Sequence, residues 1–425
     1  MNEAESLAAY VGIDWADKRH AVCLATGDGG HEITALDQTP EALDVWAQEL
    51  YERFGGRPIG VCVEQRRGAL IYALLKYPWL VLYPLNPRQL SSYRDAVNPS
   101  GAKDDDGDAG LLCDFLRLHR GQLRPLAVED AVTREIRGLA EGRRKLVDLR
   151  TKLGNQLRQQ LKECFPQALD LAGASMHADA FLKLLAKFPS LKAMQRASPR
   201  TLVNYLPRRR KTEDEPADGP NGGIDPRVAR LRAAVPLVDD RAIVAVGTRM
   251  IEALVKQLRA LGESIREYDQ NLAKLMDAHP DGELFRSLPG AGAAMAPRLI
   301  AAFGADRERF AAAEDVQTAS GIAPITVQSG KSRATRRRRA CPKFVRQTFH
   351  EFADHSLKAS SWALACYRMY RARGMRHHAA LRSLAFKWIR VLFRCWKSQT
   401  PYNETRHLQA LKRANSPLLA YLPAA

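Results

Sequence analysis

Four acidic side chains near the start of the chain have the type and spacing needed to hold catalytic metal. Asp14 follows an apolar run, Glu64 ends another, and Asp105 and Asp108 open a helical stretch. Residues three apart on a helix share a face, so the last two can point at one spot. Carboxylates gathered without cationic partners repel one another unless a divalent ion neutralises them, and oxygen-only ligation suits Mg²⁺ or Mn²⁺. Two such ions can promote phosphodiester displacement. Each acid alone is more typical of a helix cap or a solvated charge.

A strongly basic segment, KSRATRRRR at residues 331–339, has six Lys or Arg among its nine residues. It can neutralise several phosphates and make binding steeply salt dependent. The whole chain carries a net charge of +18, with 65 Lys and Arg against 47 Asp and Glu, and nucleic acid is the expected partner. The alternatives are a generally basic protein or a disordered basic segment. The basic residues predicted to bind nucleic acid are Lys331, Arg333, Arg336, Arg337, Arg338 and Arg339.

The elements around the first acids predict a mixed α/β sheet with helices packed on it. YVGIDWADKRHAVCL gives two apolar runs around a polar break, which indicates a strand pair. Thr39 and Pro40 have the residue types of a helix N-terminus. Later elements are expected as strands at 58–63 and 80–85 and a helix at 68–75. This α/β domain is predicted to span residues 1–125.

Two long amphipathic stretches follow the α/β domain. Residues 134–165 and 240–278 are rich in helix-forming residues, contain no proline and predict a helical or coiled-coil arm within 126–283, rather than a third globular core. Between them, residues 208–226 are charged and rich in Pro and Gly, and we predict a flexible loop there.

The last part, residues 284–425, is expected to be all-α. LFRSLPGAGAAMAPRLIAAFG resembles a helix-hairpin-helix, in which Gly290 and Gly292 would let backbone N–H groups approach a phosphate. A plain helix–helix turn is the alternative. The aromatic residues between 362 and 396 are expected mostly in the core, with one or two able to stack on bases.

The remaining composition excludes several classes of protein. The seven cysteines are scattered singly, with no CxxC pair and no Cys/His spacing suited to zinc, so we expect reduced and mostly buried thiols. No window approaches the roughly 20 apolar residues of a membrane span, and the N-terminus does not read as a secretion signal. We expect no membrane partner and a place in the prokaryotic cytosol or nucleoid.

Six motifs in order resemble the DEDD transposases of insertion sequences, also known as bridge-RNA-guided serine recombinases. They are VGIDWADKRHAVCL, VCVEQRRGALIYALL, LNPRQLSSYRDA, KDDDGDA, LPGAGAAMAPRLIAAFG and SGIAPITVQSGKS. The likeness covers roughly residues 9–120 and 284–400. It implies a RuvC-like, RNase H-type domain with the metal ligands Asp14, Glu64, Asp105 and Asp108, and a C-terminal transposase domain whose nucleophile is Ser329.

Departures from the family pattern keep some assignments open. The family's lysine-threonine-aspartate run has Asp104 in place of threonine, so Asp104 is an alternative third ligand. Ser320 and Ser332 are rivals for the nucleophile. Ser329 precedes Gly330, where the backbone can bend and expose a hydroxyl.

The resemblance implies a metal-assisted attack by Ser329 on DNA through a covalent phosphoserine. The implied partners are double-stranded DNA from the element ends and the target, a structured noncoding guide RNA, and further copies of the chain. A homodimer would assemble to a tetramer, with Ser329 and the acids meeting across protomers. The basic run at 208–211 and the faces of the arm can grip such an RNA. The alternatives are a RuvC-like nuclease or junction resolvase that uses water, and a nucleic-acid-binding scaffold without chemistry.

Overall fold

The computed structural model describes residues 7–27, 29–98, 104–173, 175–206, 225–330 and 332–422. Two compact units make up the chain, Met1–Val128 and Glu129–Ala425. The loop expected at residues 208–226 lies outside the described residues except for its last two positions. In the described part of the chain, every helix is too short or too polar to cross a lipid bilayer.

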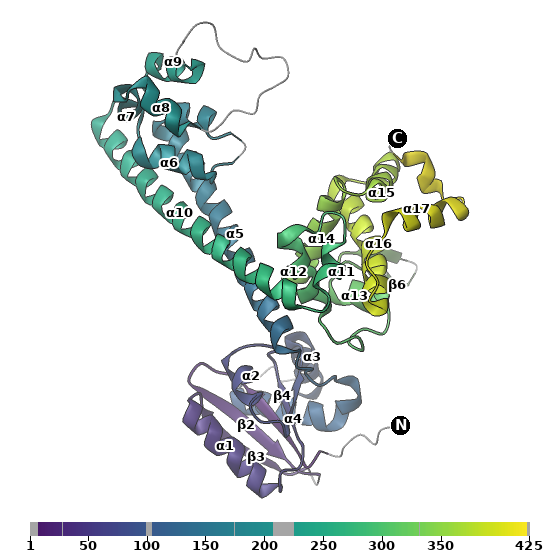
Figure 1. The fold of residues 1–425 in the computed structure, drawn as a ribbon. Coiled ribbons are helices and arrows are strands. Elements are labelled where there is room, and N and C mark those ends of the chain that lie inside the picture. The colour runs from purple at the N-terminus through teal and green to yellow at the C-terminus, as the bar shows by residue number, and fades with distance from the viewer. Residues whose placement is uncertain are drawn as a thin grey trace. The chain divides into compact units, whose positions relative to one another are not determined.

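The first unit is built on a five-stranded mixed sheet in the order β3-β2-β1-β4-β5 (Figure 1). β1 pairs antiparallel with β2, which pairs antiparallel with β3, whereas β1, β4 and β5 are parallel neighbours. This is the RNase H-like sheet that the sequence predicts. The strands are β1 (Ala9–Asp14), β2 (Arg19–Ala25), β3 (His31–Asp37), β4 (Ile59–Val63) and β5 (Leu80–Pro84).

Helices cover both faces of this sheet. Alternate side chains of a strand point to opposite faces. Val11 and Ile13 accordingly pack in the core that contains Leu43 of α1, while Gly12 meets α4. Thr39 caps α1 as predicted, its Oγ1 accepting from the Ala42 N–H at 3.2 Å. The helices are α1 (Pro40–Arg53), α2 (Ala69–Leu74), α3 (Pro87–Val97) and α4 (Asp105–His119), followed by the 3-10 turn η1 (Arg120–Gln122).

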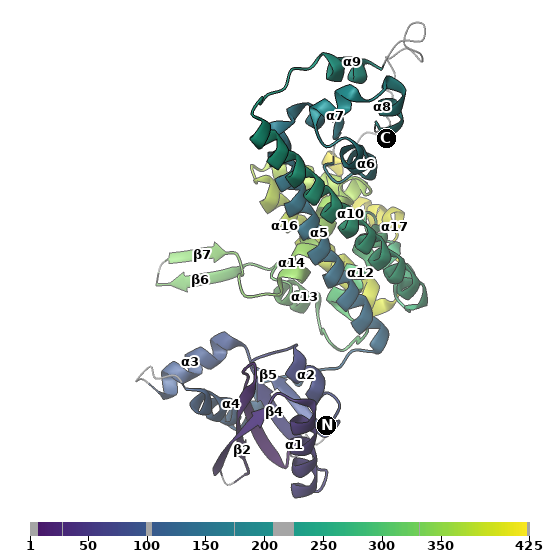
Figure 2. The same cartoon turned by 90° about the vertical axis from the view of Figure 1, so that its left-hand side faces the viewer.

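The second unit begins with a pair of long helices, α5 (Ala131–Cys164) and α10 (Arg241–Ala278), which lie side by side as the sequence predicts (Figures 1 and 2). Shorter helices between them build a hydrophobic core against the arm helices, with Phe181 and Leu185 packed with Leu161 and Leu258. The arm therefore ends in a small globular cap, where the sequence was expected to form an arm rather than a globular core. The cap consists of η2 (Pro166–Leu171), α6 (Asp179–Lys187), α7 (Leu191–Arg196), α8 (Pro199–Tyr205) and α9 (Pro226–Ala233).

The rest of the second unit is helical apart from one β-hairpin. Its core holds Trp362, Trp388 and Trp396, all nearly inaccessible to solvent, so the prediction that most of these aromatics are core is confirmed. The hairpin was not predicted. The elements are α11 (Gly282–Arg286), α12 (Gly292–Phe303), α13 (Ala313–Ala319), β6 (Ile325–Ser329), β7 (Ser332–Arg336), α14 (Lys343–Ser356), α15 (Ser361–Ala372), α16 (His377–Ser398), α17 (Glu404–Arg413) and η3 (Pro417–Tyr421).

Candidate catalytic and nucleic-acid-binding sites

Asp14 and Glu64 lie at the carboxyl ends of two neighbouring parallel strands. Ile13 of β1 pairs with Val63 of β4, so Asp14, the last residue of β1, and Glu64, the residue after β4, are neighbours at this end of the sheet. Both acids are half-buried. In open α/β sheets, ligands bind outside the carboxyl ends of the strands. The sheet therefore presents two of the four predicted acids at the edge where a catalytic site is expected.

Gly12 sets the position of the helix that carries the other two acids. A Cβ atom at this residue would lie 2.0 Å from the Ala109 carbonyl oxygen and 2.4 Å from the Cys113 backbone nitrogen. The α4 backbone thus rests directly on β1, which only glycine permits. The Cys113 sulfur contacts the Tyr10 carbonyl oxygen at 3.3 Å, while Ala109 clusters with Ala21, the partner of Asp14 in the sheet. The first turn of α4 therefore lies toward the Asp14 end of β1.

Asp104 caps α4. Its Oδ1 accepts a hydrogen bond from the Gly107 N–H at 2.6 Å. Aspartate and threonine are both good N-cap residues, so Asp104 can cap α4 in place of the threonine of the family pattern. This favours Asp105, which is exposed in the first turn, over Asp104 as the third ligand.

Asp108 is buried and ion-paired. Arg94 of α3 donates from Nε to Oδ1 at 2.7 Å and from Nη2 to Oδ2 at 2.6 Å, a bidentate contact. The expectation that the acids lack cationic partners is therefore wrong for Asp108, because α3 brings an arginine that the spacing of the acids did not reveal. The carboxylate oxygens still have the chemistry that a hard divalent cation requires. A metal bound by Asp108 would take the place of the Arg94 guanidinium.

The acids are not closely gathered in this conformation. Within the described ranges, only Cys23, His31 and Cys113 form a group of at least three His, Cys, Asp or Glu residues whose ligand atoms all lie within 4.8 Å of one another. The structure thus brings Asp14, Glu64 and the start of α4 to one edge of the sheet, but no three of these described acids place their oxygens within 4.8 Å of one another.

His20 is a buried residue near the site that the sequence did not single out. Its Nδ1 accepts from the Ala16 N–H at 3.1 Å, so its Nε2 carries the proton shared with the Gln38 side chain. These bonds fix the turn that follows Asp14. A single histidine in a polar turn gives no sequence signal of such a role.

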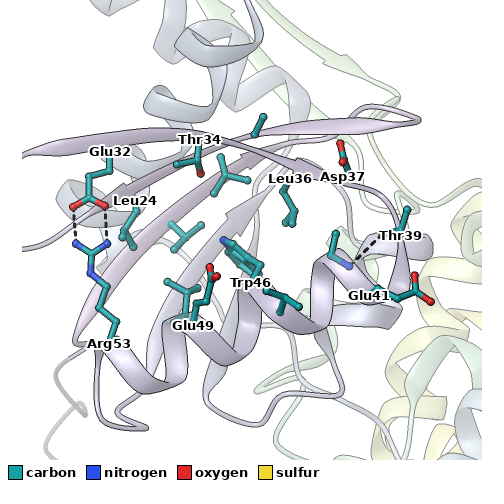
Figure 3. Close-up of a pocket in the computed structure, with 16 residues that line it drawn as sticks. Leu24, Glu32, Thr34, Leu36, Asp37, Thr39, Glu41, Trp46, Glu49 and Arg53 are labelled. Carbon is teal, nitrogen blue, oxygen red and sulfur yellow. Dashed lines mark hydrogen bonds and ion pairs between the residues drawn. The ribbon is translucent and has the colours of Figure 1, made fainter.

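A cavity of about 690 Å³ lies between α1 and the strands β2 and β3 (Figure 3). Trp46, Leu24 and Leu36 line it, and a bidentate pair between Glu32 and Arg53 closes one end. None of the predicted site residues that the structure describes lines this cavity. It is thus distinct from the edge that bears the acids.

Ser329 lies at the tip of the β6–β7 hairpin. It pairs with Ser332 across the turn, and Gly330 adopts a φ of +54° there. Ser329 is exposed, as predicted for a reactive hydroxyl. Ser320, by contrast, is fully buried and donates to the Gln317 carbonyl oxygen at 3.1 Å, which argues against it as the nucleophile. Lys331 lies outside the described residues.

The hairpin extends away from the helices of its unit (Figure 2). Most of its side chains are exposed, including Val327 at 41%. Arg333 and Arg336 lie on β7, and Arg337 to Arg339 follow it directly. The Nε atom of Arg338 is buried without a hydrogen-bond partner. A projecting basic hairpin of this kind has the charge and exposure to lie along a phosphate backbone.

A cluster of cations lies on the helices that follow the hairpin. Burial, together with the nearby charges of Arg337 and Arg346, lowers the pKa of Arg382. Burial and the neighbouring His378 and Arg382 also lower the pKa of His350, against a smaller opposing effect of Asp354. Like charges disfavour one another's ionised form, so the positive charge of this unit continues from the hairpin onto α14 and α16.

The two predicted glycines of the turn between α11 and α12 have different surroundings. Gly290 has a φ of +82°, and a Cβ atom there would lie 2.8 Å from the His355 carbonyl oxygen at the end of α14. Gly292 has a φ of +50°, is exposed and has open space around it. Packing on α14 is thus sufficient reason for glycine at position 290, whereas Gly292 at the start of α12 remains accessible to a phosphate.

Two family models match this chain in sequence order. Residues 11–166 match a model for DEDD transposases of the IS110 type, described as "Transposase". Residues 282–368 match one described as "Transposase IS116/IS110/IS902 family". The chain belongs to the IS110 family of DEDD transposases.

Curated relatives agree with this membership over most of the length. The chain is 28% identical over 424 residues to the "Mini-circle putative transposase for IS117" of Streptomyces coelicolor, covering 96% of this chain and 99% of the relative. It is 24% identical to the insertion element IS116 uncharacterized 44.8 kDa protein of Streptomyces clavuligerus, over 90% and 93% of the two chains. A Sinorhizobium fredii transposase, y4uE, named as putative, is 31% identical over 47% of this chain and 56% of its own.

Membership of the IS110 family establishes the reaction class. The protein is a transposase, an enzyme that cleaves and transfers DNA. It therefore binds DNA, and the DEDD family implies a divalent metal without specifying which ion. The predicted combination of an RNase H-like sheet with a largely helical second part is confirmed.

Proposed function

We propose that this IS110-family transposase cuts and rejoins DNA by attack of Ser329 on the scissile phosphate, under the guidance of a structured noncoding bridge RNA. The observation that carries the serine assignment is the place of Ser329, exposed at the tip of a projecting hairpin and followed by exposed arginines. A nucleophile must reach a phosphate that is embedded in a duplex, and a projecting strand pair gives that reach.

The reaction proposed for Ser329 is a transesterification. Its Oγ forms a bond to phosphorus, the bond from phosphorus to the 3′ oxygen breaks, and the strand leaves with a 3′ hydroxyl. The proton lost by serine balances the proton gained by the leaving oxygen. The arginines of β7 would bind other phosphates of the same DNA along the hairpin. The free 3′ hydroxyl then attacks a phosphoserine on a partner strand, which restores Ser329.

Asp14, Glu64, Asp105 and Asp108 are proposed to hold Mg²⁺ or Mn²⁺ for this step. The ion would supply positive charge at the reacting phosphate and polarise it. The supporting observations are the adjacent positions of Asp14 and Glu64 and the seating of α4 on Gly12. Before metal binds, the ion pair with Arg94 holds the Asp108 carboxylate in place.

Self-association and RNA binding complete the proposal. Exposed apolar side chains at positions 243, 246 and 250 form one stripe on α10, with Ile243, Val246 and Met250 exposed by 53%, 67% and 47%. Such a stripe supports self-association of the chain. We propose a homodimer that assembles to a tetramer, with Ser329 and the acids supplied by different protomers. The net charge of +18 is consistent with binding both RNA and DNA in the prokaryotic nucleoid.

The test compares two serines that face each other across one hairpin. Wild type, Ser329→Ala and Ser332→Ala proteins are incubated with the element ends, a target duplex, the flanking noncoding RNA and Mg²⁺. Covalent protein–DNA adducts and strand exchange are then measured. We expect both products with wild type and Ser332→Ala, and neither with Ser329→Ala, although the latter should still bind DNA.

Other outcomes assign other functions. Cleavage by Ser329→Ala without an adduct would identify a nuclease or junction resolvase that uses water. Adducts that persist in Ser329→Ala would place the nucleophile elsewhere. Exchange that proceeds equally without the RNA would remove the guide from the proposal.

A further inference from the structure

A compact set of soft ligands lies in the first unit, on residues that the proposed DNA chemistry does not use. The Sγ atoms of Cys23 and Cys113 and a ring nitrogen of His31 all lie within 4.8 Å of one another. Both cysteines are buried and neither forms a disulfide, while His31 is exposed. Two sulfurs and an imidazole are the donors that Zn²⁺ and related thiophilic cations prefer.

Strand register and helix packing produce this cluster from distant parts of the sequence. His31 of β3 pairs with Ala25 of β2, two residues from Cys23 and on the same side of the sheet. Gly12 pairs with Cys23 and lies against the Cys113 backbone. The sequence expectation of no zinc-type spacing is therefore misleading, because the cluster depends on tertiary contacts and leaves no short motif.

Asp114 supports His31 in the way that a metal ligand is usually supported. Its Oδ1 lies 3.1 Å from His31 Nε2 and is also bound by Arg117 Nη2 at 2.9 Å. A histidine that donates one N–H to a carboxylate is oriented to bind a metal through the other nitrogen. Here the donated proton is on Nε2, which leaves the Nδ1 lone pair available.

The thiols are already electronically unequal. The hydrogen bond with the Cys113 thiol lowers the pKa of Cys23 despite burial. The same hydrogen bond and burial raise the pKa of Cys113. Metal ions bind the thiolate form of cysteine, so binding of a cation at this site would release the thiol protons.

From this geometry we propose that Cys23, His31 and Cys113 bind one thiophilic divalent cation of the Zn²⁺ type, separate from the ion held by the acids. The cation would connect β2 and β3 to α4, the helix that carries Asp105 and Asp108. The exposure of His31 leaves a fourth coordination position open to water. The site is independent of the serine mechanism and of RNA guidance.

Cobalt titration of the full-length, metal-free protein tests the proposal, because Co²⁺ bound to thiolate gives a charge-transfer absorption that Co²⁺ bound to carboxylates lacks. We expect one equivalent per chain to produce this band and Zn²⁺ to displace it. His31→Ala should weaken binding by at least about tenfold, as should Asp114→Asn, since supporting carboxylates typically contribute 10- to 100-fold. Cys341→Ser, in the other unit, should bind as wild type does.

His31 is exposed, so its loss should leave the fold intact, which thermal unfolding in EDTA would verify. A thiol count should show two cysteines protected by Zn²⁺ in wild type and fewer in His31→Ala. Absence of the thiolate band in wild type, unchanged affinity in His31→Ala, or a Cys23–Cys113 disulfide in the protein purified under nitrogen would each overturn the proposal. Loss of DNA exchange in Ser329→Ala would not bear on it.

Discussion

Arg94 and Asp108 form the most consequential pair of single residues in the candidate catalytic site. The Asp108 side chain is 4% exposed and that of Arg94 is 16% exposed, so solvent screens the pair little. A carboxylate left in such a place without its cation is strongly destabilised. A divalent ion and the guanidinium therefore compete for the same carboxylate.

Replacement of Arg94 by methionine tests this competition. We expect Arg94→Met to lower the free energy of unfolding by about 3 kcal/mol in EDTA, because a buried carboxylate loses its partner. Mg²⁺ should then raise the melting temperature of this variant more than that of wild type. Thermal unfolding with and without Mg²⁺ measures both effects. Arg88→Met, an exposed change on the same helix, is the control, and an equal Mg²⁺ effect in both variants would contradict the idea.

Some site residues could be placed from the sequence and others could not, because the latter depend on tertiary packing. Asp14 and Glu64 could be placed at strand ends because each follows an apolar run that is itself a strand. The pairing of Arg94 with Asp108 could not be foreseen, since it depends on how α3 and α4 pack together. The capping by Asp104 was readable in principle from its place before the helix.

At the scale of elements, contact between α4 and β1 depends on the absence of a side chain at Gly12. Alanine there would bring a methyl group 2.0 Å from the Ala109 carbonyl oxygen. We expect Gly12→Ala to destabilise the protein by about 3 kcal/mol and to reduce DNA cleavage, because α4 must move from the sheet with Asp105 and Asp108. Chemical denaturation and a cleavage assay measure the two effects.

Gly110 on the facing helix provides the matched control. A Cβ atom there meets nothing within 4 Å, and alanine is favoured over glycine in a helix by up to about 1 kcal/mol. Gly110→Ala should therefore be neutral or stabilising. Equal destabilisation by the two substitutions would show that Gly12 has no special role.

A helix or strand could be predicted from the sequence where it buries enough apolar side chains to give a periodic pattern. The long helices α5 and α10 have a periodic apolar stripe and were predicted nearly to their ends. β3 was missed because Leu36 is its one buried residue, which leaves no alternating pattern. The β6–β7 hairpin was missed for the same reason, since its strands bury almost nothing.

At the scale of the whole second unit, His279 joins the end of α10 to the start of α5. Its Nε2 lies 3.0 Å from Thr133 Oγ1, and its Nδ1 accepts from the Asp281 N–H at 3.0 Å. Burial lowers the pKa of His279 below the ordinary 6.5, although Asp281 and Asp130 oppose this. In the acid range the unfolded chain therefore binds a proton that the folded chain resists.

Stability contributed by His279 should be complete above pH 6.5 and should fall as pH drops toward the lowered pKa. The loss within that window is at most about 1.4 kcal/mol per pH unit. We expect His279→Gln to flatten the fall in melting temperature between pH 7.5 and 5.5, set against the exposed His355→Gln as control. Parallel pH profiles for wild type and His279→Gln would argue against this role.

The proposed assembly concerns the complete molecule, and the apolar stripe of α10 is the surface proposed to mediate it. A charge at its centre should separate the copies, so Val246→Glu should shift the protein toward monomer in light scattering. Its free energy of unfolding should stay within about 1 kcal/mol of the wild-type value. Ala245→Glu adds the same charge at an exposed neighbouring position. A tetramer that survives Val246→Glu would show that another surface carries assembly.

The β6–β7 hairpin has a thermodynamic consequence for target capture. A two-stranded ribbon bare on both faces is only marginally stable by itself, so the free energy of docking must also supply its ordering. The observed Kd for DNA then equals the Kd of the ordered hairpin divided by the fraction of molecules in which the hairpin is already ordered. Under the proposed serine mechanism, a substitution that rigidifies the hairpin would tighten DNA binding without adding a contact to DNA.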